Sequence, residues 1–214
     1  MRCIVNEQQQ GGHLMVDRKN SSLNYNQKRL LFIVQFAILL AIEAIVCFTP
    51  LGSLPALGPI VATLSHIPVI ITAMVMGTGA GAAMGFFFGL FSFLVMTFMP
   101  PSPIAFVFTP FYSVGEIGGN YWSLVICFVP RILIGVVAGL SYRSLSRLFN
   151  DNFWSYTISG ILGSLTNTLL VLGGIYLFFG EQFASVNNVG FNLVLGILGM
   201  TVLTSGIPEA IIGG

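Results

Sequence analysis

The chain of 214 residues is 55% hydrophobic and 7% charged, and its mean hydropathy is +0.91. Because ordinary soluble domains carry about 25% charged residues, this composition predicts an integral membrane protein. A net charge of +1 gives no basis for nucleic-acid binding. The apolar runs are continuous and longer than the about 9–11 residues of a barrel strand, so we expect an all-α protein with transmembrane helices.

The N-terminal segment, residues 1–27, is polar and lacks a hydrophobic period. We expect it to be a disordered cytosolic segment. The first apolar run, Leu30–Phe48, follows Lys28 and Arg29. A signal peptide is the alternative, but the apolar part is long and the residues after it are a poor cleavage site. A retained first helix is therefore predicted.

Small residues mark one face of this first helix. Ala37 and Ala41 are one turn apart, so they share a face that another helix can approach closely. Glu43 lies about 200° around the helix from Ala41. We expect the carboxyl group to point inward, on the side opposite the alanines.

The next two predicted spans, residues 60–76 and 80–98, contain a proline and a glycine repeat that affect where a helix starts and how the helices pack. Pro68 removes a backbone donor, so the helix should start late or kink there, beside His66. The imidazole of His66 then either donates a hydrogen bond to a backbone carbonyl that Pro68 leaves without its helical donor, or contacts the substrate. In the next span Gly81, Gly85 and Gly89 repeat every four residues, which predicts close packing of these two spans.

A long loop, residues 99–120, contains the aromatic side chains Phe106, Phe108, Phe111 and Tyr112. Such rings form either a lid beside a cavity or anchors at the membrane interface. Both interpretations stay open at this point.

The fourth predicted span, residues 122–142, has Arg131 near its middle. Placing a cation in hydrocarbon costs about 2.5–17 kcal/mol, so Arg131 should face protein or a cavity. The fifth span, residues 154–179, carries Asn167 and Thr168 near its centre. Lipid offers no hydrogen-bond partners for the side-chain amide of Asn167, so this amide should face Arg131 or a bound polar ligand.

The last apolar region follows a predicted polar loop at residues 180–189 and is interrupted around Pro208 and Glu209. It is either one helix with a kink or a helix break, and we expect a sixth helix that is truncated at residue 214. Six helices place both termini in the cytosol, because all the cations near the spans then lie on that side. These cations are Arg18, Lys19, Lys28, Arg29, Arg143 and Arg147.

The predicted intramembrane polar set consists of Glu43, His66, Arg131, Asn167 and Glu209. It fits a proton relay, an anion-binding pocket, or a structural ion pair of Arg131 with Glu43 or Glu209. The three cysteines have no ligand spacing, so neither a metal site nor a disulfide framework is expected. They are Cys3, Cys47 and Cys127.

Four motifs in order resemble the substrate-binding (S) component of energy-coupling factor (ECF) vitamin transporters. They begin at Ser65-His-Ile-Pro, Pro130-Arg-Ile-Leu, Gly163-Ser-Leu-Thr-Asn and Gly206-Ile-Pro-Glu. The chain is most similar to the pantothenate branch, with the hydroxymethylpyrimidine and riboflavin branches close behind. The resemblance covers residues 28–214.

The resemblance implies a multi-pass protein of the bacterial cell membrane that binds a vitamin and is not an enzyme. It would work with a transmembrane coupling protein and two cytosolic ATPases, which use ATP and Mg, and would itself hold no cofactor, metal or catalytic residue. Ala37 and Ala41 match the motif that docks on the coupling protein. The candidate substrate-binding residues are Arg131, Asn167, Thr168, His66, Glu209 and Glu43.

Ligand charge bears on the identity of the vitamin. Pantothenate is an anion, to which a buried guanidinium offers charge-assisted, bidentate hydrogen bonds, whereas a flavin would need stacking rings. Two other classes of membrane protein are less consistent with the sequence. A proton-coupled secondary transporter would use Glu43 and His66, but no inverted repeat is visible. An intramembrane enzyme is disfavoured because the sequence lacks His-Glu-x-x-His and Gly-x-Ser-x-Gly motifs.

Overall fold

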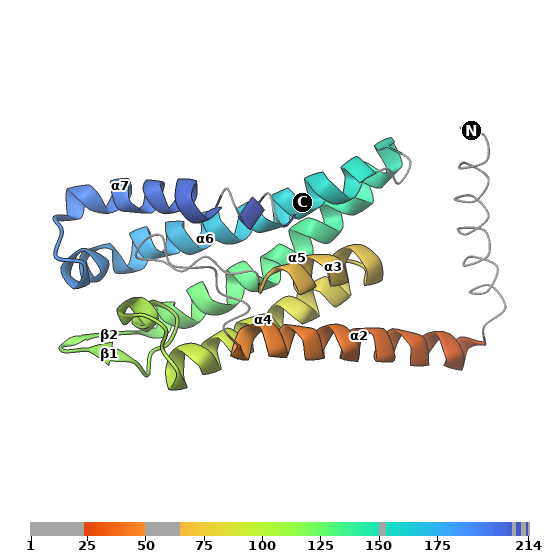
Figure 1. Ribbon diagram of the computed structural model, residues 1–214, viewed down its shortest axis with the longest axis horizontal. Helices are drawn as coiled ribbons and strands as arrows, with labels where there is room; N and C mark the ends of the chain where they lie inside the picture. The colour runs from red at the N-terminus through yellow and green to blue at the C-terminus, as the bar shows by residue number, and fades with distance from the viewer. Residues whose placement is uncertain (1–23, 50–64, 150–152, 207–208, 211–212, 214) are drawn as a thin grey trace. The chain divides into compact units, whose positions relative to one another are not determined.

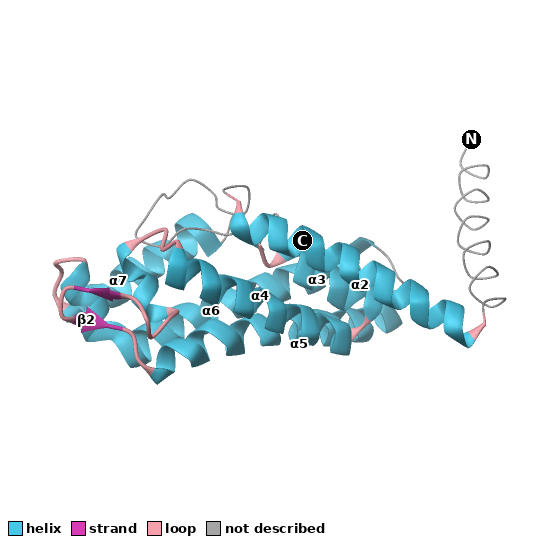
Figure 2. Ribbon diagram, turned by 90° about the horizontal axis from the view of Figure 1, so that it is seen from below, coloured by secondary structure: helices cyan, strands magenta, loops and turns pink. Residues whose placement is uncertain are grey.

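The computed structural model describes residues 24–49, 65–149, 153–206, 209–210 and 213. Most of these residues are helical (Figures 1 and 2). The α-helices are α2 (Tyr25–Phe48), α3 (Ile67–Met76), α4 (Thr78–Phe98), α5 (Tyr121–Phe149), α6 (Phe153–Val186) and α7 (Phe191–Thr201). The 3-10 helix η2 (Pro103–Val107), the hairpin strands β1 (Ser113–Val114) and β2 (Ile117–Gly118), and the π-helix η3 (Val202–Gly206) complete the described elements.

Within the described residues, four helices are long and apolar enough to cross a membrane, namely Tyr25–Phe48, Thr78–Phe98, Tyr121–Leu148 and Phe153–Val186. Two shorter apolar helices cover Ile67–Met76 and Phe191–Thr204. The predicted helical membrane class is therefore confirmed. The late start of the second predicted span is also confirmed, because α3 begins at Ile67 with Pro68 in its first turn, where a missing N–H is tolerated. Residues 60–64 lie outside the described part.

The start of α2 lies earlier than the predicted end of the disordered segment at residue 27. Residues 1–23 of the predicted disordered segment lie outside the described residues, but Tyr25 to Gln27 already belong to α2. The backbone N–H of Asn24 donates to Oε1 of Gln27 at 2.9 Å. A side chain three residues into a helix that reaches back to the cap residue stabilises the helix start.

The end of α6 also differs from the predicted boundary. The predicted loop at residues 180–189 is wrong, because α6 continues to Val186. The helix bends at Phe179, whose φ and ψ are −133° and 15°. A second helical stretch follows this kink and runs to Val186, and Phe179 and Phe183 are both fully buried in the core.

The chain divides into two compact units, residues 1–38 and 39–214. In the second unit α5 packs against α3, α4 and α6, and α7 packs against α6 (Figure 1). The main core lies where η2 meets α5, α6 and α7. There the rings of Phe106 and Phe179 meet edge to face at a centroid distance of 5.9 Å.

The glycine strip on α4 packs mainly against α5, which corrects the predicted pairing. A Cβ atom on Gly81 would overlap Ala73 of α3, as predicted, and would also lie 3.0 Å from the carbonyl oxygen of Gly135 on α5. A Cβ on Gly85 would overlap the carbonyl oxygen of Arg131, and one on Gly89 would lie 2.9 Å from the ring of Phe128. Glycine thus brings the α4 backbone directly against the segment of α5 that carries Arg131.

Replacing Gly85 with alanine is expected to lower the thermal stability of the purified protein. The new methyl group would overlap backbone atoms of α5, which cannot rotate away, and overpacking of this kind costs about 1–3 kcal/mol. Thermal unfolding in detergent measures the effect. Gly79→Ala on the same helix is the matched control, because a Cβ at Gly79 meets nothing within 4 Å. Equal melting temperatures for the two variants would contradict the packing described above.

Candidate functional site

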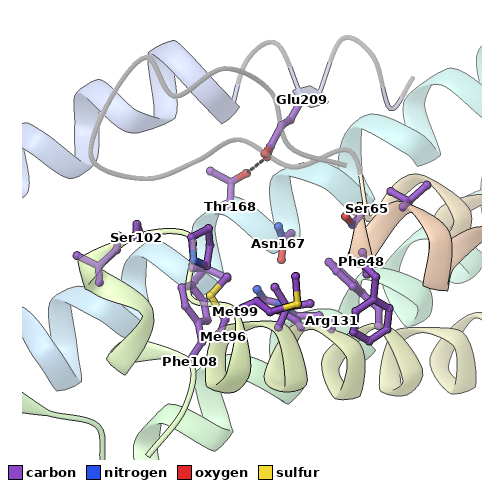
Figure 3. A pocket seen from close by; sticks show the side chains of 18 of the residues that line it. Phe48, Ser65, Met96, Met99, Ser102, Phe108, Arg131, Asn167, Thr168 and Glu209 are labelled. Carbon is purple, nitrogen blue, oxygen red and sulfur yellow. Dashed lines mark hydrogen bonds between the residues drawn. The ribbon is translucent and has the colours of Figure 1, made fainter. Parts of the chain in front are cut away.

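A cavity of about 350 Å³ lies within the unit of residues 39–214 (Figure 3). This volume is in the range of sites that bind small molecules, about 300–1,000 Å³. Its walls come from the end of α2, from α4, α5 and α6, from the loop around η2, from the end of α7, and from a C-terminal segment represented by Gly206 and Glu209. Its polar lining residues are Cys47, Thr49, Ser65, Ser92, Ser102, Arg131, Asn167, Thr168, Thr201 and Glu209.

Arg131 is held in the cavity wall by its own helix. Pro130 has no backbone N–H, so the carbonyl of Ile126, one turn earlier, is left without its helical donor. The Nη1 group of Arg131 donates to that carbonyl at 2.9 Å. The proline next to the arginine thus creates the acceptor that orients the guanidinium.

Aromatic rings support the same guanidinium. Its Cζ atom lies 5.5 Å from the ring centre of Phe88 and 5.0 Å from that of Phe108, within cation–π range. Arg131 is 6% exposed, and its Nε has no hydrogen-bond partner among the described residues. A guanidinium has five N–H donors, so this fixed cation retains donors for an anionic ligand.

Asn167 and Thr168 contribute neutral polar groups from α6. Both are buried, and Oδ1 of Asn167 has no hydrogen-bond partner among the described residues. The hydroxyl of Thr168 is 3.4 Å from the carbonyl oxygen of Ser164 and 3.4 Å from Oε2 of Glu209. These contacts are longer than the usual O–H···O distance of about 2.7–2.8 Å. The hydroxyl is therefore free to exchange them for a ligand group.

Four predicted site residues thus line one cavity. Figure 3 shows Glu209 and Thr168 on the wall opposite Arg131, with Asn167 between them. Glu209 is 6% exposed, so it is buried as the predicted polar set requires. A cation and a carboxyl group face the same small volume.

His66 and Glu43 are placed elsewhere, and neither lines the cavity. Both are fully buried. Glu43 accepts a hydrogen bond from the Cys47 thiol at 3.2 Å, and Cys47 lies in the cavity wall. The partner of Glu43 is therefore Cys47 rather than Arg131. Glu43 points inward and Ala41 is exposed, as predicted.

The aromatic residues of the predicted loop have separate roles. Phe106 is buried in the core, Phe108 lines the cavity, and Phe111 is 75% exposed. The Ser123 hydroxyl donates to the Phe106 carbonyl at 2.8 Å, which ties η2 to α5. The part of the loop that carries Phe108 is thus a fixed wall of the cavity.

Sequence reasoning missed the wall that α4 provides. Phe88, Ser92, Val95, Met96 and Met99 line the cavity. Their spacing of about one helical turn was the available signal, together with a serine inside an otherwise apolar span. The glycine repeat on the same helix marks only the face that packs against α5.

Comparison with known proteins identifies the family. Residues 31–214 match the family described as ECF transporter, substrate-specific component. The pantothenic acid transporter PanT of Lactococcus lactis subsp. cremoris is 36% identical over 155 residues, 72% of this chain and 72% of that protein. The pantothenate transporter PanT of Leuconostoc mesenteroides subsp. mesenteroides is 27% identical over 195 residues, 87% of this chain and 78% of that protein.

A solved structure shares the fold. The crystal structure of the S-component for biotin from an ECF-type ABC transporter matches with a TM-score of 0.54 at 15% identity, over 90% of each chain. This likeness concerns the fold alone, whereas the family match and the two sequence relatives each cover most of the chain at the level of sequence. The chain is a multi-pass bacterial membrane protein and belongs to the substrate-specific component family of ECF transporters.

Proposed function

We propose that this chain is the pantothenate-binding subunit of an ECF importer. The observation that carries the proposal is the buried guanidinium of Arg131, which is fixed by protein groups yet faces the cavity with donors to spare. Two relatives named as pantothenate transporters support the same ligand. Burying a cation in a membrane protein is costly, and an anionic substrate compensates that cost.

The chemistry of pantothenate suits this cavity. The molecule carries a carboxylate at one end, an amide in the middle, and two hydroxyl groups beside a dimethyl carbon at the other end. The carboxylate would pair with Arg131, and the amide and hydroxyl groups would bond to Asn167 and Thr168. Met96 and Leu172 offer apolar contacts. A flavin is less well served, because the rings of Phe88 and Phe108 already contact Arg131.

The energy for transport would come from partner subunits that hydrolyse ATP. In this proposal six helices cross the membrane with both termini in the cytosol, which keeps Lys28, Arg29, Arg143 and Arg147 on the cytosolic side. Ala37 and Ala41 would dock on a transmembrane coupling protein, and two ATPases would hydrolyse ATP. Both alanines are exposed, as a docking face requires. This chain would capture the vitamin and topple in the membrane to release it.

Titration calorimetry on the purified chain tests the ligand. Pantothenate should bind at least about 100-fold more tightly than riboflavin or hydroxymethylpyrimidine, a difference of about 2.7 kcal/mol. Tighter binding of either competitor would overturn the choice of vitamin. Uptake into proteoliposomes separates the classes of transporter, because an S component needs ATP and the coupling proteins. Gradient-driven uptake by this chain alone would indicate a secondary transporter.

A further inference from the structure

A guanidinium and a carboxyl group lie on facing walls of the cavity. Arg131 of α5 and Glu209 of the C-terminal segment are each 6% exposed and both line the cavity. Figure 3 shows them on opposite sides, with Asn167 between. An anionic ligand therefore finds an attractive end and a repulsive end.

Glu209 lies beside α6. Its Oε2 atom is 3.4 Å from the Thr168 hydroxyl. Three residues earlier, Gly206 lies so close to α6 that a Cβ atom there would come within 2.9 Å of Cγ2 of Thr168. Because Thr168 shares its hydroxyl between Glu209 and the Ser164 carbonyl at 3.4 Å each, a ligand hydroxyl can take over its place at Oε2.

We infer that Glu209 is a specificity-determining residue that admits a neutral hydroxyl end of the ligand and rejects a second negative charge. The inference rests on the proposed function, in which the carboxylate of pantothenate lies at Arg131. The hydroxyl end then lies toward Glu209 and donates a hydrogen bond to it. A phosphate on the terminal hydroxyl would bring two like charges together in a buried site, which is strongly unfavourable.

The test compares pantothenate with pantothenate phosphorylated on its terminal hydroxyl, by titration calorimetry at one salt concentration. The wild-type chain should bind the phosphorylated form at least about 100-fold more weakly. Glu209→Gln loses the charge but keeps an acceptor oxygen, so it should bind pantothenate about 3- to 10-fold more weakly. In that variant the discrimination against the phosphorylated form should fall at least about tenfold. Glu181→Gln, at an exposed carboxylate on α6, should leave both affinities unchanged.

A second comparison needs no variant and covers the case in which Glu209→Gln does not fold. Pantothenate acetylated on the terminal hydroxyl is bulkier but gains no charge. The wild-type chain should bind it at least about tenfold better than the phosphorylated form. Equal rejection of both derivatives would mean that size excludes them and would overturn the inference, as would equal binding of pantothenate and its phosphorylated form. A wild-type chain that does not bind pantothenate at all would instead overturn the proposed function.

Discussion

Replacing Arg131 with alanine is expected to weaken pantothenate binding by about 30- to several-thousand-fold, which corresponds to about 2–5 kcal/mol. The substitution leaves the carboxylate of the ligand buried without its cationic partner. It also removes the hydrogen bond to the Ile126 carbonyl and the contacts with Phe88 and Phe108. Titration calorimetry on monodisperse protein measures the loss.

Two controls separate binding from folding. Arg143→Ala removes an exposed cation from the same helix, so its affinity should stay that of the wild type. Arg131→Met keeps an unbranched aliphatic side chain at this position but removes the charge. The wild-type chain should strongly prefer pantothenate over panthenol, its neutral alcohol, and Arg131→Met should lose most of that preference. A folded Arg131→Ala protein with unchanged affinity would remove Arg131 from the site.

The charged centre of the site was predictable from the sequence because membrane burial makes polar groups expensive. A lone arginine in an apolar run had to face protein or a cavity, and Asn167 had to find a polar neighbour. The structure places both on one cavity. The adjacent Pro130 was also visible in the sequence, but its role in freeing the Ile126 carbonyl emerges only from the position of the guanidinium.

Other parts of the site could not be predicted, because membrane helices are apolar on all sides. Without an amphipathic pattern, hydrophobicity does not show which face turns inward. The α4 wall with Ser92 and Met96 was therefore missed. Burial of Glu43 and His66 was correctly inferred, yet burial alone does not say which cavity a side chain meets. The wall formed by Phe108 depends on long-range contacts of η2 with α5 and α6, which local sequence does not encode.

Tryptophan in place of Ala37 or Ala41 is expected to stop transport without weakening vitamin binding. Helices in membranes approach closely through small residues, and a large indole ring on that face would hold a partner helix away. Both alanines are exposed, and neither they nor their α2 neighbours Ile38 and Ile42 line the cavity. Affinity for pantothenate should therefore stay within about twofold, whereas ATP-driven uptake should fall at least about tenfold, to the level of liposomes without this chain.

The control for these variants adds the same bulk on a different helix. Leu195 of α7 is 63% exposed and does not line the cavity, so Leu195→Trp should leave both binding and uptake unchanged. Co-purification with the coupling protein gives a second readout, which the alanine variants should lose and the control should keep. If Ala41→Trp still co-purified and transported, the coupling protein would have to bind another surface. The alanine pair would then be only a chance feature of an apolar helix, while the assignment of the vitamin cavity would stand unaffected.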